Sequence, residues 1–268
     1  MAFDEQYYNI GYLDRLSYQD TFVHRLDPRI KLITTLLFLF TVISFSKYEV
    51  AALLPFFLFP VILLTAGEIP LWFILKKVVI VSPFAIFIGI FNPLLDASPV
   101  TVLPGLTLAA GWFSFASILL KFILTVSTAL LLVATTSFPT VCHGLRQLGV
   151  PSIFVSQLLF LYRYIFVLAE EAMRMVRARD MRSFGHEGTN VKVFIRIAGV
   201  LFLRTVERAE RIYSAMLARG FQGDMPTRKR YRITARDLVF AGSVTFYLFV
   251  FRFYPATEIL GRFFQELF

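Results

Sequence analysis

The sequence predicts an all-α polytopic membrane protein of about five transmembrane helices, with a cytoplasmic domain of one short and two long amphipathic helices. Three features of the chain indicate this fold class. Of its 268 residues, 57% are apolar and only 17% are charged, a composition outside the range of ordinary soluble domains. Long charge-free runs alternate with short polar segments. The excess positive charge is confined to one internal stretch.

That stretch orients the chain. Residues 139–236 contain 17 Lys and Arg against 7 Asp and Glu, whereas the rest of the chain contains 10 against 11. Because membrane proteins retain Lys and Arg on the cytoplasmic side, we expect 139–236 and the N-terminus to be cytoplasmic. Nucleic acid explains the charge less well, because the stretch is also rich in Leu, Ile, Val and Phe. The polar, mixed-charge residues 1–29 do not resemble a signal peptide.

The charge-free runs give the spans in order. Five are predicted: Leu32–Ser46, Val50–Gly67, Val78–Leu95, Trp112–Thr136 and Leu238–Tyr254. The first is short, and a snorkelling Lys31 can extend it. Pro55 and Pro60 are expected to kink the second. Residues 68–77 and 97–111 are expected to be loops, the latter because of its Pro and Gly content.

The cytoplasmic stretch predicts three helices. A short one covers Thr140–Leu148 and stops at Gly149. A long one runs from Ser152 to about Ser183, and a second long one from about Asn190 to Arg219. The predicted division is therefore an N-terminal segment 1–29, spans in 30–137, a cytoplasmic domain 138–236, and a last span with its tail in 237–268.

The two long helices end in similar triplets about forty positions apart. The first contains Ala178-Arg179-Asp180 and the second Ala218-Arg219-Gly220. Two matched basic helix ends suggest docking to two similar partners, since Arg grips carboxylates and carbonyls with a planar fork of donors. A basic amphipathic helix on anionic lipid is the alternative, and lipid contact is expected to contribute.

Two further positions are candidate sites. Lys121 lies inside a predicted span, where a charge is costly unless it faces protein or water. It marks either an intramembrane site or a long helix from which it snorkels. Two short spans in place of the single span Trp112–Thr136 would need a turn at Lys121, where no Gly or Pro occurs. Asp27-Pro28-Arg29 precedes the first span. It is either a functional motif or simply a turn with a basic residue that anchors the helix by the positive-inside rule.

Residues for catalysis or metal binding are not evident. His24, His143 and His186 have no ligand spacing, and Cys142 is the single cysteine. A phosphate-binding G-x-x-x-x-G-K-[ST] motif is absent from the sequence. We therefore expect no cofactor, no metal site and no enzymatic activity in this chain itself.

The motifs resemble a known family. The run His24-Arg25-Leu26-Asp27-Pro28-Arg29-Ile30-Lys31-Leu32 and the two Ala-Arg triplets are similar to those of energy-coupling factor (ECF) transporter T proteins. The resemblance covers about residues 20–225. The long polar N-terminus and Arg182-Ser183-Phe184-Gly185 resemble the CbiQ branch, which serves cobalt or nickel uptake. Asp180 departs from the family's pattern, because it stands in the glycine position of the first triplet.

The resemblance implies a function. T proteins of this family join two cytoplasmic ABC-type ATPase subunits to a substrate-capture membrane subunit, here CbiM-like, with a small CbiN-like accessory protein. The two helix ends dock in the ATPases, and the long helices cross to transmit motion. Asp27, Pro28 and Arg29 would be anchoring residues in a prokaryotic plasma membrane. The alternatives are the T subunit of a vitamin-type ECF importer, a self-sufficient secondary transporter or channel, and a membrane enzyme acting on lipid.

Overall fold

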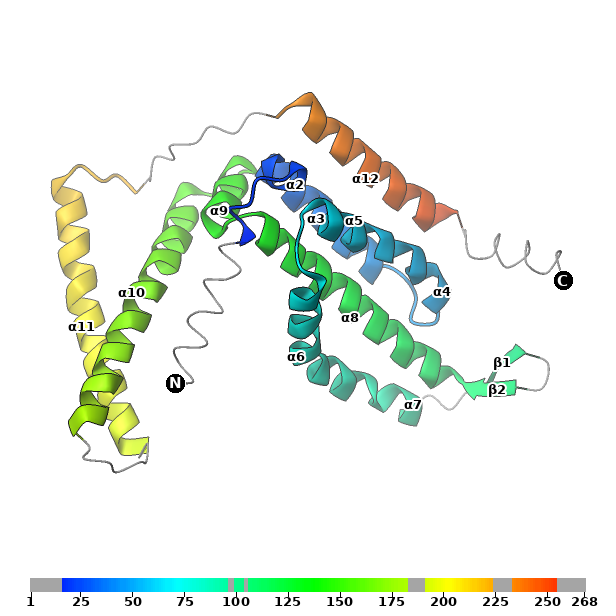
Figure 1. Cartoon of the computed structure of the whole chain (residues 1–268), viewed down its shortest axis with the longest axis horizontal. Helices are drawn as coiled ribbons and strands as arrows, with labels where there is room; N and C mark the ends of the chain where they lie inside the picture. Colours follow the sequence, from blue (N-terminus) through cyan, green and yellow to red (C-terminus); the bar gives the residue numbers. More distant parts are fainter. Residues whose placement is uncertain (1–15, 96–98, 104–105, 183–190, 224–232, 255–268) are drawn as a thin grey trace. The chain divides into compact units, whose positions relative to one another are not determined.

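The computed structural model describes residues 16–95, 99–103, 106–182, 191–223 and 233–254 (Figure 1). These residues fall into two compact units, one within Phe138–Arg230 and the other within Leu13–Ser137 and Tyr231–Phe268. The predicted helix end near Gly185, His186 and much of the predicted N-terminal segment lie outside the described residues.

The second of these units, the apolar unit, contains most of the helices. They are α2 (Phe22–Arg25), α3 (Pro28–Ile43), α4 (Val50–Leu53), the 3₁₀ helix η1 (Leu54–Phe57), α5 (Leu58–Ala66), α6 (Leu71–Gly89), α7 (Phe91–Leu95), α8 (Ala110–Thr135) and α12 (Ala235–Phe253). Two antiparallel strands, β1 (Pro99–Leu103) and β2 (Leu106–Ala109), precede α8.

Helix α8 is the centre of the apolar unit. It packs against α3, α4, α5, α6 and α7, and α12 packs against α3. The core between them is aromatic: the ring of Phe38 stacks on Phe59 at 4.7 Å between centroids, and Phe45 meets Phe56 edge-on. A Cβ atom at Gly89 would lie 2.8 Å from the Phe115 ring. The absent side chain therefore lets α6 approach α8 closely, as small residues do between membrane helices.

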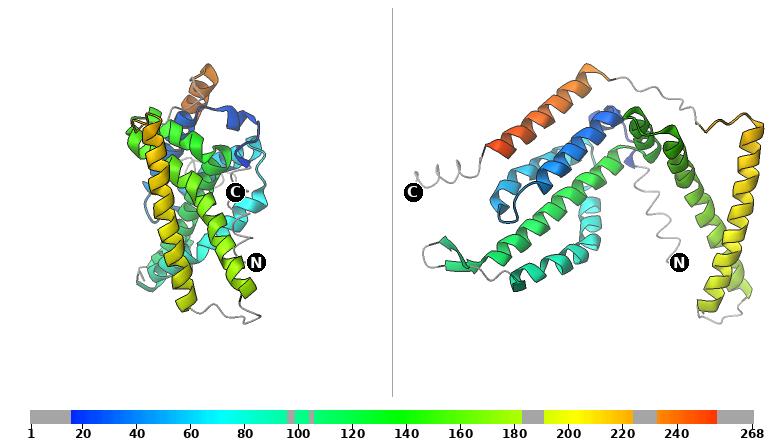
Figure 2. Two further views of the ribbon diagram at one scale, coloured as in Figure 1. Left: turned by 90° about the vertical axis from the view of Figure 1, so that its left-hand side faces the viewer. Right: turned by 180° about the vertical axis from the view of Figure 1, so that it is seen from behind.

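The other unit, the long-helix unit, contains α9 (Phe138–Gln147), α10 (Ser152–Arg182) and α11 (Val191–Ala218). Gly149 follows α9 at φ +101°. The N–H groups of Gly149 and Val150 donate to the carbonyls of Arg146 and Leu145, which is the glycine-terminated helix end expected from the sequence. Figure 2 shows α10 and α11 lying side by side and running in opposite directions.

Most predicted elements are present, and the all-α membrane fold is confirmed. Two loop predictions were wrong. Residues 71–77 are helical, because α6 begins directly after Pro70 and its lysines are accommodated within the helix; Lys77 lies over the Phe73 ring. Residues 99–103 and 106–109 form the two antiparallel strands, where β-branched Val100 and Thr101 favour extended backbone. The predicted kink near Pro55 appears as η1.

Three described helices are long and apolar enough to cross a membrane: Leu71–Pro93, Gly111–Thr135 and Ser152–Arg182. The first two correspond to the third and fourth predicted spans. The third is α10, which the charge distribution assigns to the cytoplasm. The number of five spans stays a prediction, because α3 has only 16 residues and α12 carries Arg236, Asp237 and Arg252.

Candidate functional site

The antiparallel pairing of α10 and α11 places the two Ala-Arg triplets at opposite ends of one helix pair. Midway along α11, Arg204 donates a hydrogen bond of 2.7 Å to Glu171 of α10. Near the start of α10, the Ser156 hydroxyl donates to the Gly223 carbonyl at 3.2 Å. Ser156 and Arg179 belong to the same helix, so at 1.5 Å per residue roughly 35 Å separates the two ends. A pair of this length can contact two separate partners.

Arg219 caps the C-terminus of α11. Gly220 adopts φ +79°, and its N–H donates to the Leu217 carbonyl at 2.9 Å. The Phe221 N–H donates to the Met216 carbonyl at 3.0 Å. These two bonds form a Schellman motif, which satisfies the last carbonyls and turns the chain away from the helix axis. The Arg219 side chain is exposed and makes no ion pair with the residues that the structure describes, so its guanidinium is available to a partner.

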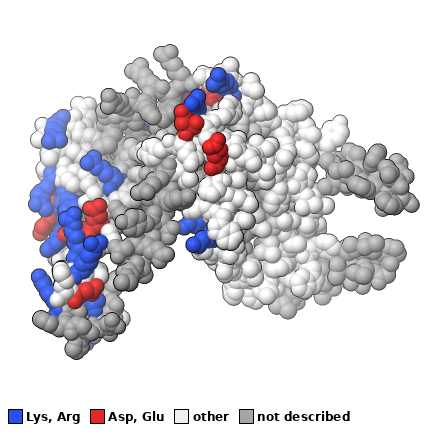
Figure 3. Space-filling view, viewed as in Figure 1, with Lys and Arg blue, Asp and Glu red and all other residues white. Residues whose placement is uncertain are grey.

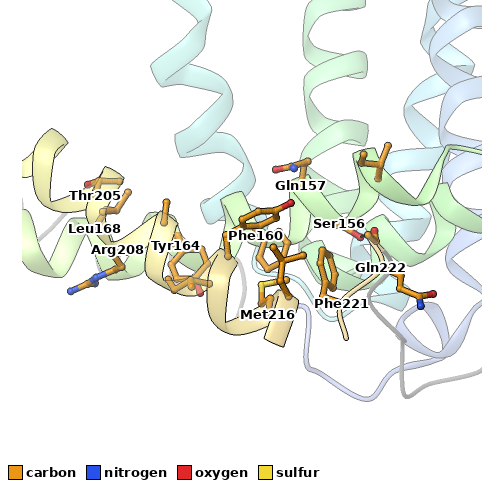
Figure 4. Close-up of a pocket in the computed structure, with 16 residues that line it drawn as sticks. Ser156, Gln157, Phe160, Tyr164, Leu168, Thr205, Arg208, Met216, Phe221 and Gln222 are labelled. Atoms are coloured by element: carbon orange, nitrogen blue, oxygen red, sulfur yellow. Dashed lines mark hydrogen bonds between the residues drawn. The ribbon is translucent and has the colours of Figure 1, made fainter. Parts of the chain in front are cut away.

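The turn after Arg219 is seated on α10. The Phe221 ring meets Phe160 of α10 edge-on, with 6.3 Å between centroids. Phe221 and Met216 also line an apolar cavity of about 580 Å³ between the two helices, here called the apolar cavity. Figure 4 shows Phe221 and Ser156 toward one end of it and Leu168, Thr205 and Arg208 toward the other. Contacts with α10, in addition to the hydrogen bonds at the end of α11, therefore hold the turn that carries Arg219 in place.

Arg179 occupies a different environment. It lies within α10, which continues to Arg182. Asp180 stands where Gly220 stands in the second triplet, and a residue with a Cβ adopts the helix-ending positive φ less readily than Gly. The Arg179 side chain is only 23% exposed and lies 3.3 Å from Asp180 Oδ1. It lines a groove of about 530 Å³, here called the basic groove. The charged residues of the basic groove are Arg174, Arg179, Arg182, Arg196, Arg204 and Glu171.

Asp27, Pro28 and Arg29 form the start of α3. Asp27 is the N-cap, and its Oδ1 accepts a 2.9 Å hydrogen bond from the Arg29 N–H. Pro28 occupies the first helical position, where its missing N–H is not needed. The Asp27 side chain is buried, and its own N–H donates to Asp237 Oδ1 at 2.8 Å. The triplet therefore fixes the start of α3 against the start of α12.

Lys31 does not snorkel. Its residue is only 5% exposed, and its ammonium group donates to the carbonyls of Thr135 and His24 and to the Thr136 hydroxyl. These acceptors belong to the end of α8 and to α2, so Lys31 joins three segments. Burial, and then the nearby Lys31 charge, lower the pKa of His24. Sequence reasoning missed the contact because a Lys at a helix start is also typical of a positive-inside anchor.

Lys121 has a local backbone partner. Its ammonium group donates to the Phe45 carbonyl, just past the end of α3. Cations are favourable at helix C-termini, where carbonyls lack intrahelical partners. Arg252 of α12 reaches the same place: it donates to the Ser44 hydroxyl and lies over the Phe45 ring, 4.6 Å from its centroid. Lys121 and Arg252 thus both stabilise the end of α3.

Among the described residues, no group of three or more His, Cys, Asp or Glu is placed to hold a metal ion. Cys142 is buried in α9, and burial raises the pKa of its thiol to about 11. Two residues that the sequence analysis did not single out shape the site. Asp237 was detectable from the Thr234-x-x-Asp237 spacing of a capping box, and Phe221 from its place one residue after a helix-ending Gly.

Comparison with known proteins identifies the family. Residues 19–231 match the sequence model of the cobalt transport protein family, CbiQ. The Bacillus subtilis energy-coupling factor transporter transmembrane protein EcfT is 30% identical over 83% of this chain and 87% of its own length. The Salmonella typhimurium cobalt transport protein CbiQ is 25% identical over 79% of this chain and 97% of its own. An uncharacterized Methanocaldococcus jannaschii protein is 30% identical over 81% and 77%, respectively. The chain therefore belongs to the CbiQ family, as the transmembrane T component of an ECF transporter.

Proposed function

We propose that this T component transmits ATP-driven motion from two cytoplasmic ABC-type ATPase subunits to a substrate-capture membrane subunit. The observation that carries the proposal is the placement of Arg179 and Arg219 at opposite ends of one antiparallel helix pair. Each end would enter a groove of one ATPase, with Arg gripping carboxylates or carbonyls there. A rigid pair of helices can convert the relative motion of two ATPases into a displacement of the bundle.

The transported substrate is proposed to be cobalt, or nickel, because the family is named for cobalt transport. The metal would be bound by a CbiM-like capture subunit, with a CbiN-like accessory protein, rather than by this chain. The chain itself would be non-catalytic, and ATP hydrolysis would occur in the partners. It would cross the plasma membrane several times, with the N-terminus and residues 138–236 in the cytoplasm, and without nucleic acid as a partner.

A T subunit serving vitamin capture proteins is the second candidate. The identity to Bacillus subtilis EcfT, 30%, exceeds the identity to Salmonella typhimurium CbiQ, 25%. The two candidates share the same docking ends and differ in the capture subunit. Purification of the chain from its native membrane in mild detergent, with identification of the co-purifying capture protein, separates them.

The docking role is tested by charge reversal. Arg219→Glu is expected to release the ATPase and abolish uptake, while the variant remains in the membrane. Arg179→Glu is expected to weaken ATPase binding as well. Arg211→Glu is the matched control, because Arg211 is exposed on the same helix two turns before Arg219. Co-purification of the ATPase and uptake of radioactive cobalt are measured for each. Normal ATPase binding and uptake by the Arg219 variant would refute the docking role.

A further inference from the structure

The stretch Phe138–Arg230, which contains the long-helix unit, is joined to the rest of the chain at two points, here called the two crossings. The first follows Ser137, and the second precedes Tyr231. On the side of the apolar unit, the first crossing lies at the end of α8, and the second lies a few residues before the start of α12. Motion that the chain itself carries from the long-helix unit into the apolar unit must pass through these two helix ends.

Lys31 holds the helix end at the first crossing. Thr135 is the last residue of α8, and its carbonyl accepts a 2.9 Å hydrogen bond from the Lys31 ammonium group. The Thr136 hydroxyl accepts a second bond, of 3.2 Å, from the same group. The last carbonyls of a helix have no partner within it and carry its partial negative charge, so a cation is favoured at this position. Lys31 therefore caps the end of α8 from the start of α3.

Asp237 holds the helix end at the second crossing. One of its carboxylate oxygens accepts from the N–H and the hydroxyl of Thr234, the residue before α12. The other oxygen accepts from the N–H of Asp27, the residue before α3. A carboxylate is favoured at the N-terminus of a helix, and this one serves two helices at once. The start of α12 is therefore bound to the residue that caps α3.

Charge links these two contacts. The Lys31 ammonium group attracts the carboxylates of both Asp27 and Asp237. Asp27 Oδ2 is buried without a hydrogen-bond partner among the described residues, so the nearby cation is what compensates its charge. Figure 3 shows few charged side chains on the face of the apolar unit that is in view, whereas they gather over α10 and α11. The linked residues, here called the junction cluster, are each at most 5% exposed: Asp27, Lys31, Thr135, Thr136 and Asp237.

Buried charges of this kind contribute little net stability, because desolvation offsets their attraction, but they can specify a single geometry. In the junction cluster, that geometry relates the end of α8 to the starts of α3 and α12. The three helix ends are thus tied to one another at the place where both crossings reach the apolar unit.

We propose that the junction cluster keeps the two crossings in register under load, with Lys31 as the positioning residue, so that α3, α8 and α12 move together. This inference rests on the proposed function, which supplies the ATP-driven motion. Helix ends without such contacts open locally, since terminal turns are among the least stable parts of a fold. Opening would absorb the displacement at the crossings, and ATP would then be hydrolysed without moving the bundle.

Hydrogen–deuterium exchange of the full chain in complex with its ATPase, purified in mild detergent, tests the proposal. Backbone exchange is followed by mass spectrometry, with and without ATP turnover, in peptides that cover the end of α8 and the starts of α3 and α12. In the wild type, exchange there is expected to be the same in both conditions. In Lys31→Met it is expected to be faster without ATP and faster again during turnover, because the load opens helix ends that are no longer tied.

Leu53→Ala separates this role from a general loss of stability. Leu53 is fully buried in α4, which follows the opposite end of α3, and its truncation leaves a cavity that lowers the melting temperature. ATP turnover is expected to add nothing to exchange at the three helix ends of this variant. Thr136→Val is a milder change, because it removes one acceptor of Lys31 and nearly keeps the side-chain shape. It should show the same ATP-dependent increase as Lys31→Met to a smaller extent, and it decides the matter if Lys31→Met does not fold.

Exchange that is independent of ATP in both Lys31→Met and Thr136→Val would overturn the proposal, as would an equal ATP-dependent increase in Leu53→Ala. The same data test the docking role separately, because a docked ATPase protects the turn after Arg219 from exchange. Without that protection the docking role fails, and this inference fails with it. With that protection but without ATP-dependent exchange in the Lys31 and Thr136 variants, this inference fails alone.

Discussion

The backbone N–H of Asp27 donates a 2.8 Å hydrogen bond to Oδ1 of Asp237, 210 residues later in the chain. Both residues are N-terminal helix residues: Asp27 caps α3, and Asp237 closes the capping box of α12. The other oxygen of Asp237 accepts from the N–H and hydroxyl of Thr234. One carboxylate therefore satisfies donors at the starts of two helices, and the nearby Lys31 charge interacts favourably with both aspartates.

Asp237→Ala is expected to lower stability by about 2–4 kcal/mol, since it removes a cap and leaves the buried Asp27 N–H without its acceptor. The melting temperature in detergent at one fixed scan rate measures the effect. Arg236→Ala, at the exposed neighbouring position, is the control and should melt within a degree or two of the wild type. Equal melting of the two variants would mean that the Asp27–Asp237 bond contributes nothing to stability.

Lys31 and Lys121 are expected to respond differently to the same substitution. Lys31→Met leaves two carbonyls and a hydroxyl without a donor in a buried site, at an expected cost of about 2–4 kcal/mol. Lys121→Met removes one part-buried bond to a single carbonyl, at an expected cost of about 1 kcal/mol or less. Their melting temperatures, compared under identical detergent and lipid, check the ranking; a Lys121 variant that is the less stable of the two would reverse it.

The ends of α9 and α11 could be predicted because their cause is local. Gly149 and Gly220 both follow apolar periodic segments and both adopt positive φ, as a helix-terminating Gly does. The span centred on α8 could be predicted for a similar reason, since apolar composition alone selects it. Each of these features depends on a few neighbouring residues.

The contacts around Lys31 could not be predicted, because they join segments that are remote in sequence. Nothing in the run around Asp27 indicates that Asp237 will accept its N–H, and nothing around Lys31 indicates the Thr135 carbonyl. The difference between the two Ala-Arg triplets could be predicted only in part. Asp180 in place of Gly indicates that α10 continues, but the five arginines of the basic groove come together only when α11 folds back on α10.

Cys142 is expected to resist alkylation. The thiolate is the reacting species, and with a pKa of about 11 roughly one thiol in a thousand is ionised at pH 8. N-ethylmaleimide should therefore label the folded chain only after denaturation in SDS, as measured by mass spectrometry. Ser214→Cys places a thiol on the exposed face of α11 and should be labelled without denaturant. Rapid labelling of Cys142 itself would show that α9 opens.

The raised pKa of the Cys142 thiol also determines how the stability of the folded chain changes with pH. The folded chain favours the neutral thiol, because its pKa is raised above the ordinary value of 9.0. The stability that this preference contributes is present below about pH 9 and is lost as the pH rises toward about 11. Cys142→Ala should therefore lose less stability than the wild type between pH 9 and pH 11, as followed by melting temperature.

Gly220 and Gly199 are expected to give opposite results on replacement by Ala. Neither position has a heavy atom within 4 Å of an added Cβ, so sterics from neighbours do not decide the outcome. Gly220 has φ +79°, where Ala costs about 1–2 kcal/mol, and the substitution disturbs the turn that positions Arg219. Gly199 lies inside α11, where Ala should stabilise the helix by about 0.5–1 kcal/mol.

Gly220→Ala should therefore weaken ATPase co-purification and lower the melting temperature. Gly199→Ala should leave co-purification unchanged and raise the melting temperature. Gly220→Asn is the informative intermediate, because Asn tolerates the left-handed region better than Ala, and it should restore part of the binding. If Gly220→Ala melts earlier but binds the ATPase normally, the Schellman turn serves the fold alone. The position of Arg219 would then not depend on it, and the seating of Phe221 on Phe160 would be left as its main determinant.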